Sequence, residues 1–197
     1  MQIVWFKRDL RTHDHAALHH AANQGPVLPL YIIEPALWQQ PDLSHRHYQF
    51  LCEGLGELDV ALTAIGQPLI VRVGDALEVL DRLAESSDVT SLWSHQETWN
   101  GWTYARDKRV KQWAKQRNIT WHEPTQHGVI RCLGDRNGWA ARWYKEMKQP
   151  ILTPPDTLQA IDVPSDALPS AKELGLIKDG STMLQKGGRS EGLTLLH

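Results

Sequence analysis

Short apolar runs rich in β-branched and aromatic residues alternate with longer helical patterns, and this alternation constrains the fold more than any other feature. The apolar runs span residues 3–6, 27–33, 68–73, 89–93 and 119–121. Between them, apolar residues recur at three- and four-residue spacing, as in the segment from Phe50 to Ile65, which is typical of an amphipathic helix. Strands joined by helices predict a parallel sheet with right-handed crossovers. We therefore expect an α/β fold, a Rossmann-like, doubly wound, five-stranded parallel sheet with helices on both faces.

Short polar side chains mark where three of these helices are expected to begin. Asp14 is a good N-cap for a helix that runs to about Asn23, Ser44 for the next one, and Asp75 for the third. Side-chain oxygens at this position accept hydrogen bonds from the free N–H groups of the first turn. A strongly charged amphipathic helix over residues 103–117 precedes the last strand.

After Pro124 the regular pattern fades. Residues 128–131 are expected to form a short extended piece, and Trp139 and Trp143 to share one face of a brief helix. Prolines then interrupt the chain at positions 150, 154, 155, 164 and 169, which predicts a linker that wraps over the surface. We expect a domain over residues 1–150, followed over residues 151–197 by the linker and the start of a second domain.

Charge and composition exclude several classes of protein. A formal net charge of −2 lacks the basic excess of a domain that grips nucleic acid unaided. The chain has no apolar run near the roughly 20 residues that span a membrane, and its start resembles no signal peptide. Cys52 and Cys132 form no CxxC pair, which predicts buried free thiols in a reducing compartment. We expect a cytoplasmic protein.

Common catalytic and nucleotide-binding signatures are absent. The sequence contains no GxGxxG after its first strand, no GxxxxGK[ST] and no GxSxG. His15 and His19 are four residues apart on a predicted helix, a spacing at which two imidazoles can share a metal ion. No other ligand motif of known spacing accompanies them, so a solvated helix face is the favoured interpretation and no metal is expected.

Polar residues gather where the predicted strands end. In an open parallel sheet, ligands bind outside the carboxyl ends of the strands. The loop after the first strand is basic, and the loop over residues 94–100 offers hydroxyl, amide and aromatic groups, so that together they suit a flat polar molecule. An alternative is that Asp9 and Arg11 pair with each other and only fix the loop. The basic stripe from Arg106 to Arg117 is better explained by an outer helix that covers the sheet than by a phosphate site.

The run from Val4 to Leu18, VWFKRDLRTHDHAAL, resembles the opening signature of the DNA photolyase/cryptochrome family, V-W-F-R-x-D-L-R-x-x-D-N-x-A-L. The Gly74-Asp75 turn and the segments 99–110, 169–176 and 187–188 extend the resemblance over most of the chain.

This resemblance implies an N-terminal α/β domain that holds a light-harvesting antenna pigment, followed in the parent protein by a helical domain that binds FAD. Photolyases use the excited reduced flavin to repair pyrimidine dimers. Because the flavin would lie in the missing helical domain, the resemblance implies that damaged DNA binds mainly through that domain. The fragment itself is expected to be monomeric and catalytically inactive, with no contact to a membrane.

The resemblance also suggests which residues hold the pigment. Candidate cofactor-binding residues are Arg8, Asp9, Arg11, Arg46, Asn100, Trp102 and Arg106. Three positions depart from the family pattern: His15 replaces an asparagine, Gly101 stands where folate-binding members carry a glutamate, and His47 occupies the place of an arginine beside Arg46. Folate, a deazaflavin, flavin mononucleotide and a lumazine all stay open as the antenna, and so does a pocket that holds no pigment.

Two alternative functions follow from the same sequence. One is a cryptochrome-type blue-light photoreceptor that signals without repairing DNA. The other, less favoured, is a free-standing nucleotide-binding domain of the same architecture.

Overall fold

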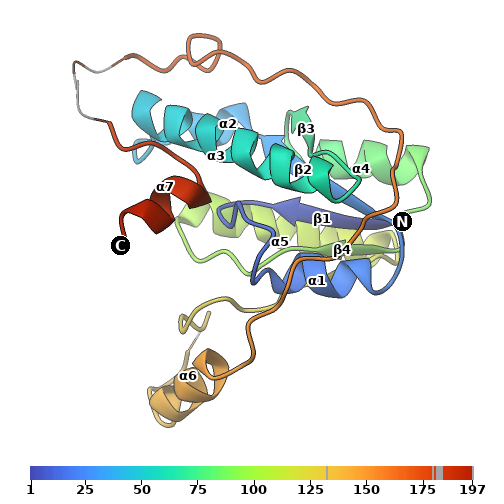
Figure 1. Ribbon diagram of the computed structural model, residues 1–197, viewed down its shortest axis with the longest axis vertical. Coiled ribbons are helices and arrows are strands. Elements are labelled where there is room, and N and C mark those ends of the chain that lie inside the picture. The colour runs from blue at the N-terminus through green and yellow to red at the C-terminus, as the bar shows by residue number, and fades with distance from the viewer. Residues whose placement is uncertain (132, 179, 181–183, 197) are drawn as a thin grey trace.

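The computed structural model describes residues 1–131, 133–178, 180 and 184–196. A sheet of five strands forms its core, and Figure 1 shows helices packed around it. Every neighbouring pair of strands is parallel, and their order is β3-β2-β1-β4-β5. The strands are β1 (Gln2–Phe6), β2 (Val27–Ile33), β3 (Ile70–Val73), β4 (Ser91–Trp93) and β5 (Thr120–His122). The expected α/β fold class is confirmed.

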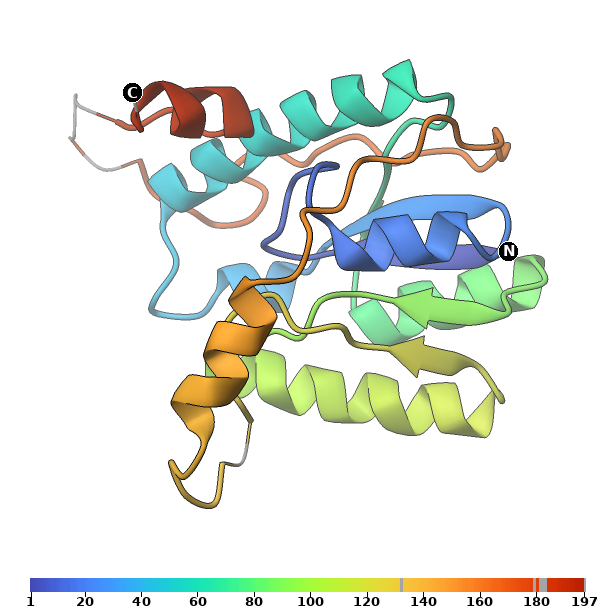
Figure 2. The same cartoon turned by 60° about the horizontal axis from the view of Figure 1, so that its bottom comes forward.

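Helices cover the sheet on both sides. The described helices are α1 (Ala16–Ala22), α2 (Pro35–Trp38), α3 (His45–Ala64), α4 (Ala76–Ser86), α5 (Gly101–Gln116), α6 (Trp139–Met147) and α7 (Arg189–Thr194). The last two, α6 and α7, contain no buried residue and lie outside the layers over the sheet. Buried residues of α1 and α3 pack with one face of the sheet, and those of α4 and α5 with the other. Figure 2 shows α3 and α5 on opposite sides of the strands.

The two-sided core explains why the strands are apolar along their whole length. Val4 and Phe6 of β1 belong to the core beneath α1 and α3, whereas Ile3 and Trp5 belong to the core beneath α4 and α5. Alternate side chains of a strand point to opposite faces, so a sheet covered on both sides buries all of them.

Polar residues stand at the starts of α3, α4 and α5. Ser44 is the N-cap residue of α3, as expected, although its side chain makes no capping hydrogen bond. Asp75 caps α4 as expected, with Oδ1 accepting a hydrogen bond from the N–H of Leu77 at 3.0 Å. Asn100 caps α5 by accepting from the N–H of Thr103 at 3.0 Å.

The expected cap of α1 is wrong. Asp14 has a φ of +51° and lies before the helix, and its Oδ1 accepts a hydrogen bond from the N–H of Leu152 at 3.2 Å. The cap is His15, whose Nδ1 accepts from the N–H of Leu18 at 3.0 Å. Asp14 is therefore hydrogen-bonded to a distant segment of the chain, and the neighbouring His15 imidazole caps α1 instead.

The proline-containing segment runs over the surface and closes one edge of the sheet. Ser165 Oγ accepts a hydrogen bond from the N–H of Val71, and the N–H of Asp166 donates to the carbonyl of Val71, both at 2.9 Å. These bonds satisfy groups that an edge strand would leave unpaired. The division of the chain at residue 150 stays a prediction.

Gly66 ends α3 as expected and lets the same segment pack closely. Its φ is +108°, and a Cβ atom built on it would lie 2.6 Å from the carbonyl oxygen of Leu158. The N–H of Leu158 donates to the carbonyl of Ile65 at 2.6 Å. Only glycine suits both the backbone angle and this approach.

Several smaller expectations have mixed outcomes. Residues 128–131 form no strand, because Gly128 lies in a bend and Arg131 in a turn. Trp139 and Trp143 share α6, as expected, and their rings stack at 6.3 Å between centroids. Cys52 is a free thiol but only half-buried, and Cys132 lies outside the described residues. Among the described helices, none is long and apolar enough to cross a membrane.

Candidate functional site

The strand order places a ligand-binding position between β1 and β4. The order reverses direction there, so the loops that leave the carboxyl ends of these two strands diverge and open a crevice. The loop after β1 and the loop over residues 95–99 together line a cavity of about 310 Å³, as the sequence predicted. A second cavity of about 460 Å³ opens beside it, over the carboxyl ends of β1 and β2.

The larger cavity has an apolar wall built by α2, α3 and the loop between them. Five side chains make most of this wall: Leu37, Trp38, Leu43, Phe50 and Leu51. The wall is aromatic as well as aliphatic, which suits a flat conjugated ring.

Polar and charged side chains also line the larger cavity. Among them are Arg8, Glu34, His47 and Arg106. The Arg8 guanidinium lies over the ring of Trp99, 4.2 Å from the ring centroid, and both residues also border the smaller cavity. This stack holds an arginine at the boundary of the two cavities, where it can meet an anionic group.

Arg106 is the centre of a buried charge network at the floor of the larger cavity. Its guanidinium donates to Glu34 at 2.7 Å, to Glu97 at 2.5 Å and to Asp107 at 2.9 Å. Each of the four side chains is at most 6% exposed. Glu34 lies in the loop after β2, Glu97 in the loop after β4, and Asp107 in α5. One guanidinium therefore links three segments near the carboxyl ends of the strands.

Two further cations complete the network through Asp107. Lys7 Nζ lies 3.5 Å from Asp107 and 4.8 Å from the ring centroid of Trp5, and Arg131 donates to Asp107 at 2.9 Å. Burial lowers the pKa of Lys7 in spite of Asp107 and Glu97. Burial likewise raises the pKa of Glu34 to about 7, and Arg106 only partly offsets this. Desolvation of the charged form therefore outweighs pairing at both groups.

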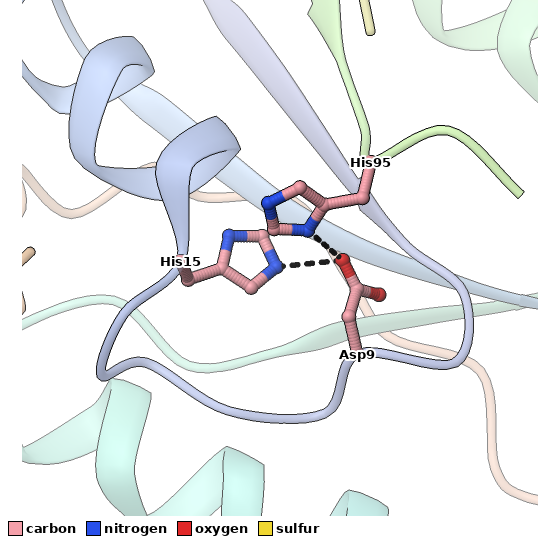
Figure 3. Close-up of side chains that lie close together, drawn as sticks. All are labelled: Asp9, His15 and His95. Carbon is pink, nitrogen blue, oxygen red and sulfur yellow. Dashed lines mark hydrogen bonds and ion pairs between the residues drawn. The ribbon is translucent and has the colours of Figure 1, made fainter. Parts of the chain in front are cut away.

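Asp9 anchors the smaller cavity through two histidines (Figure 3). Its Oδ2 lies 2.9 Å from His15 Nε2 and 2.5 Å from His95 Nδ1, and all three side chains are buried. Burial would raise the pKa of Asp9, but the two histidines outweigh burial and hold it well below its usual range. Burial lowers the pKa of His15, against the opposing effect of Asp9. The carboxylate is thus ionised in the fold.

The alternative in which Asp9 pairs with Arg11 is wrong, and so is the expected solvated position of His15. Arg11 donates instead to Gln126 at 3.3 Å and to the carbonyl of Asp14 at 3.0 Å. His15 is 1% exposed, because its ring fills the space beside Phe6 and caps α1.

The seven candidate residues do not converge on one cavity. Arg8 and Arg106 line the larger cavity, and Arg8 and Asp9 line the smaller one. Arg46 is exposed, and the neighbouring His47 lines the larger cavity in its place. Asn100 caps α5 and donates to Asp42 at 3.0 Å, and Trp102 lies 5.9 Å from the Arg106 guanidinium.

The basic stripe on α5 is divided between core and surface. Arg109 pairs with Asp75 at 3.0 Å, and Arg117 with Asp81 and Glu85, as befits a sheet-covering helix. Arg106 is the exception among these cations, because it lies inside the fold.

Sequence reasoning missed most partners of the network and the aromatic wall. Glu97, His95 and Trp38 were not among the candidate residues. Glu97 and His95 nevertheless lie in the loop over residues 94–100, which the sequence analysis had singled out for its polar groups. One signal was available for Arg106: it shares a three- to four-residue spacing with Val110 and Trp113 on the buried face of α5.

Comparison with known proteins gives consistent matches. The family model described as DNA photolyase matches residues 2–154. A deoxyribodipyrimidine photo-lyase from Vibrio cholerae is 32% identical over 126 residues, which cover 61% of this chain and 27% of that protein. A blue-light photoreceptor from Arabidopsis thaliana is 35% identical over 101 residues, which cover 48% of this chain and 23% of that protein.

A solved structure supports the same assignment. The bacterial class III photolyase from Agrobacterium tumefaciens superposes with a TM-score of 0.69 at 25% identity, over 88% of this chain and 38% of that one. The matched part of the chain spans 27% of the length of the Vibrio cholerae photo-lyase and 23% of the length of the Arabidopsis photoreceptor.

Proposed function

The chain belongs to the DNA photolyase family, and on that premise we propose that it is the light-harvesting domain of a deoxyribodipyrimidine photolyase. In the whole flavoprotein, FAD and damaged DNA bind outside these 197 residues, and the chain by itself catalyses no reaction. It works in the cytoplasm as a monomer, and its contribution is to hold an antenna pigment in a fixed place.

The observation that carries this proposal is the larger cavity. It measures about 460 Å³, and both aromatic and aliphatic side chains and polar and charged ones line it. Trp38 and Phe50 provide surfaces on which a flat ring can stack, and Arg8 and His47 can meet a carboxylate or phosphate. These residues fit a pigment that has both a conjugated ring and an anionic tail.

When bound, the pigment absorbs light and passes the excitation energy to the flavin. Energy transfer depends on distance and orientation, so the residues of the chain need only bind and orient the ring. The buried Arg106 network supports this role, because it fixes the loops after β2 and β4 that frame the floor of the cavity. Arg8 orients the pigment from the cavity boundary, where its stack on Trp99 restricts its own movement.

A fluorescence titration with matched tryptophan variants tests the proposal. The purified chain is titrated with flavin mononucleotide, a lumazine, a deazaflavin, a folate and ATP. We expect one of the four pigments to bind at one per chain. Leu37→Trp places a large ring on the cavity wall and should weaken that binding at least tenfold, whereas Ala36→Trp, exposed on the same helix, should not.

Three outcomes count against the proposal. If none of the four pigments binds the folded chain, or if both tryptophan variants bind as the wild type does, the cavity is not an antenna site. If ATP alone binds tightly, the free-standing nucleotide-binding alternative replaces it. Circular dichroism of each variant shows whether the fold is retained.

A cryptochrome-type photoreceptor is the second candidate, and the similarity to the Arabidopsis blue-light photoreceptor favours it. It would use the same antenna cavity but would signal through partners and repair nothing. The whole protein, illuminated with dimer-containing DNA, distinguishes the two functions: loss of dimers supports the photolyase, and intact dimers support the photoreceptor.

A further inference from the structure

The smaller cavity, of about 310 Å³, has no part in the antenna function as stated above, although it adjoins the larger one. Four residues line both cavities: Lys7, Arg8, Glu97 and Trp99. A ligand whose ring occupies the larger cavity can therefore extend a tail into the smaller one. Apart from Trp99, every residue that lines the smaller cavity has a polar or charged side chain, which suits a polar tail.

The two carboxylates that line the smaller cavity are engaged by other groups of the protein. Asp9 Oδ2 lies 2.9 Å from His15 Nε2 and 2.5 Å from His95 Nδ1, and Oδ1 accepts from a backbone N–H at 2.9 Å (Figure 3). Glu97 Oε2 accepts from Arg106 at 2.5 Å. Donors inside the protein thus already serve both carboxylates, and neither depends on a ligand for its hydrogen bonds.

Arg8 is a cation of this cavity whose charge is not neutralised. Its guanidinium lies over the ring of Trp99, 4.2 Å from the ring centroid, and its side chain makes no ion pair or hydrogen bond with any described residue. Lys7, in contrast, is buried and lies 3.5 Å from Asp107. The N–H groups of a guanidinium lie in its plane, so stacking on an aromatic ring leaves them available to oxygen acceptors.

A chain of hydrogen bonds leaves the Thr98 hydroxyl as a second free donor. His127 Nδ1 accepts from the N–H of Val129 at 3.2 Å, so the neutral ring carries its proton on Nε2. Nε2 lies 3.0 Å from Thr98 Oγ1 and donates to it. The hydroxyl oxygen is the acceptor in this bond, so its own proton is left for a ligand. Thr98 and His127 both line the smaller cavity.

From these observations, and on the premise of the proposed antenna function, we propose that the smaller cavity binds the phosphate of a pigment whose ring lies in the larger cavity. The groups left without a partner there are donors and a positive charge. A phosphate monoester carries about two negative charges and three acceptor oxygens, and a guanidinium pairs with it through two parallel N–H···O bonds. Among the four candidate pigments, flavin mononucleotide is the one that ends in a phosphate monoester.

A comparison of flavin mononucleotide with riboflavin isolates the phosphate, because the two molecules share the ring and the ribityl chain. Each is titrated into the purified 197-residue chain at low ionic strength, and the flavin fluorescence is followed. We expect flavin mononucleotide to bind at one per chain and at least tenfold more tightly than riboflavin. Inorganic phosphate should weaken only the binding of flavin mononucleotide. Because the chain has a net charge of −2, a general attraction of anions does not explain this preference.

Two variants and a control assign the preference to the smaller cavity. Arg8→Met removes the charge but keeps an apolar contact with Trp99, and it should lower the ratio of the two affinities at least fivefold. Thr98→Val removes the donor at nearly constant shape and should lower the ratio about two- to fivefold. Arg109→Met, which removes an exposed arginine that lines neither cavity, should leave the ratio unchanged. Circular dichroism shows whether each variant is folded.

Equal affinities for flavin mononucleotide and riboflavin overturn this inference, and so does a preference that both folded variants retain. Binding of folate, a lumazine or a deazaflavin without binding of flavin mononucleotide also overturns it, but leaves the proposed antenna function in place. If none of the four pigments binds, the antenna function itself fails, and this inference fails with it. The two failures are therefore distinguishable.

Discussion

Replacing Arg106 by methionine should destabilise the protein far more than replacing any exposed arginine of the same helix. The guanidinium lies between Glu34, Glu97 and Asp107 at 2.7, 2.5 and 2.9 Å, and every member of this group is at most 6% exposed. Methionine retains much of the volume but removes the charge. Lys7 and Arg131 still face Asp107, so the carboxylates left without a close cation are Glu34 and Glu97.

The expected loss follows from the cost of an unpaired buried charge. Breaking a buried ion pair by removing one partner costs about 3–5 kcal/mol. For a domain of this size each kcal/mol shifts the melting temperature by about 2–4 °C, so Arg106→Met should melt about 6–20 °C lower. Urea unfolding at neutral pH, followed by circular dichroism and tryptophan fluorescence, measures the free energy directly.

Arg109→Met is the matched control. Arg109 also lies on α5 and pairs with Asp75 at 3.0 Å, but its side chain is 53% exposed, so its loss should cost less than about 1 kcal/mol. Adding Glu34→Gln to Arg106→Met should recover part of the loss, because it removes one of the unpaired carboxylates. Equal, small losses for Arg106→Met and Arg109→Met would refute the argument that the buried network depends on this cation.

Three further changes test other parts of the structure. The stability of the wild type relative to Glu34→Gln should fall by about 3 kcal/mol as the pH rises from about 4.5 to about 7, because the folded carboxyl holds its proton more tightly than the unfolded one. Urea unfolding at a series of pH values measures this, and a rise in relative stability would contradict it. His15→Ala should cost about 1 kcal/mol more than His15→Asn, since only asparagine keeps the cap of α1; equal melting temperatures would argue against capping. Gly66→Ala should cost about 1–3 kcal/mol because of its positive φ and the close carbonyl of Leu158. Gly56→Ala, which meets open space within α3, should be neutral or stabilising, so equal losses for the two would contradict this account.

The sequence predicted the fold well because burial on both faces leaves a clear local pattern. The strands read as continuous apolar runs, since each one packs against helices on both sides. Asp75 was recognisable as a cap because its hydrogen bond to Leu77 is local. Asp14 misled the prediction because its partner, Leu152, lies 138 residues away.

The candidate site was less predictable because its contacts are long-range. The convergence of two loops follows from parallel-sheet topology, but the pairing of Asp9 with His95 depends on side-chain packing across 86 residues. Arg106 was a candidate through the family resemblance, but sequence spacing alone does not show which cation of the basic stripe meets buried carboxylates. The wall of the larger cavity was missed because Trp38 and Phe50 come from separate helices.

The absorption spectrum of the chain after exposure to a mixture of the four pigments tests the central claim most directly. The protein is separated from unbound pigment by gel filtration. A pigment band at longer wavelength than the tryptophan band should co-elute with the chain at about one pigment per chain, persist in Ala36→Trp and disappear in Leu37→Trp. A folded chain that retains no pigment, or a band that Leu37→Trp leaves unchanged, would contradict the account.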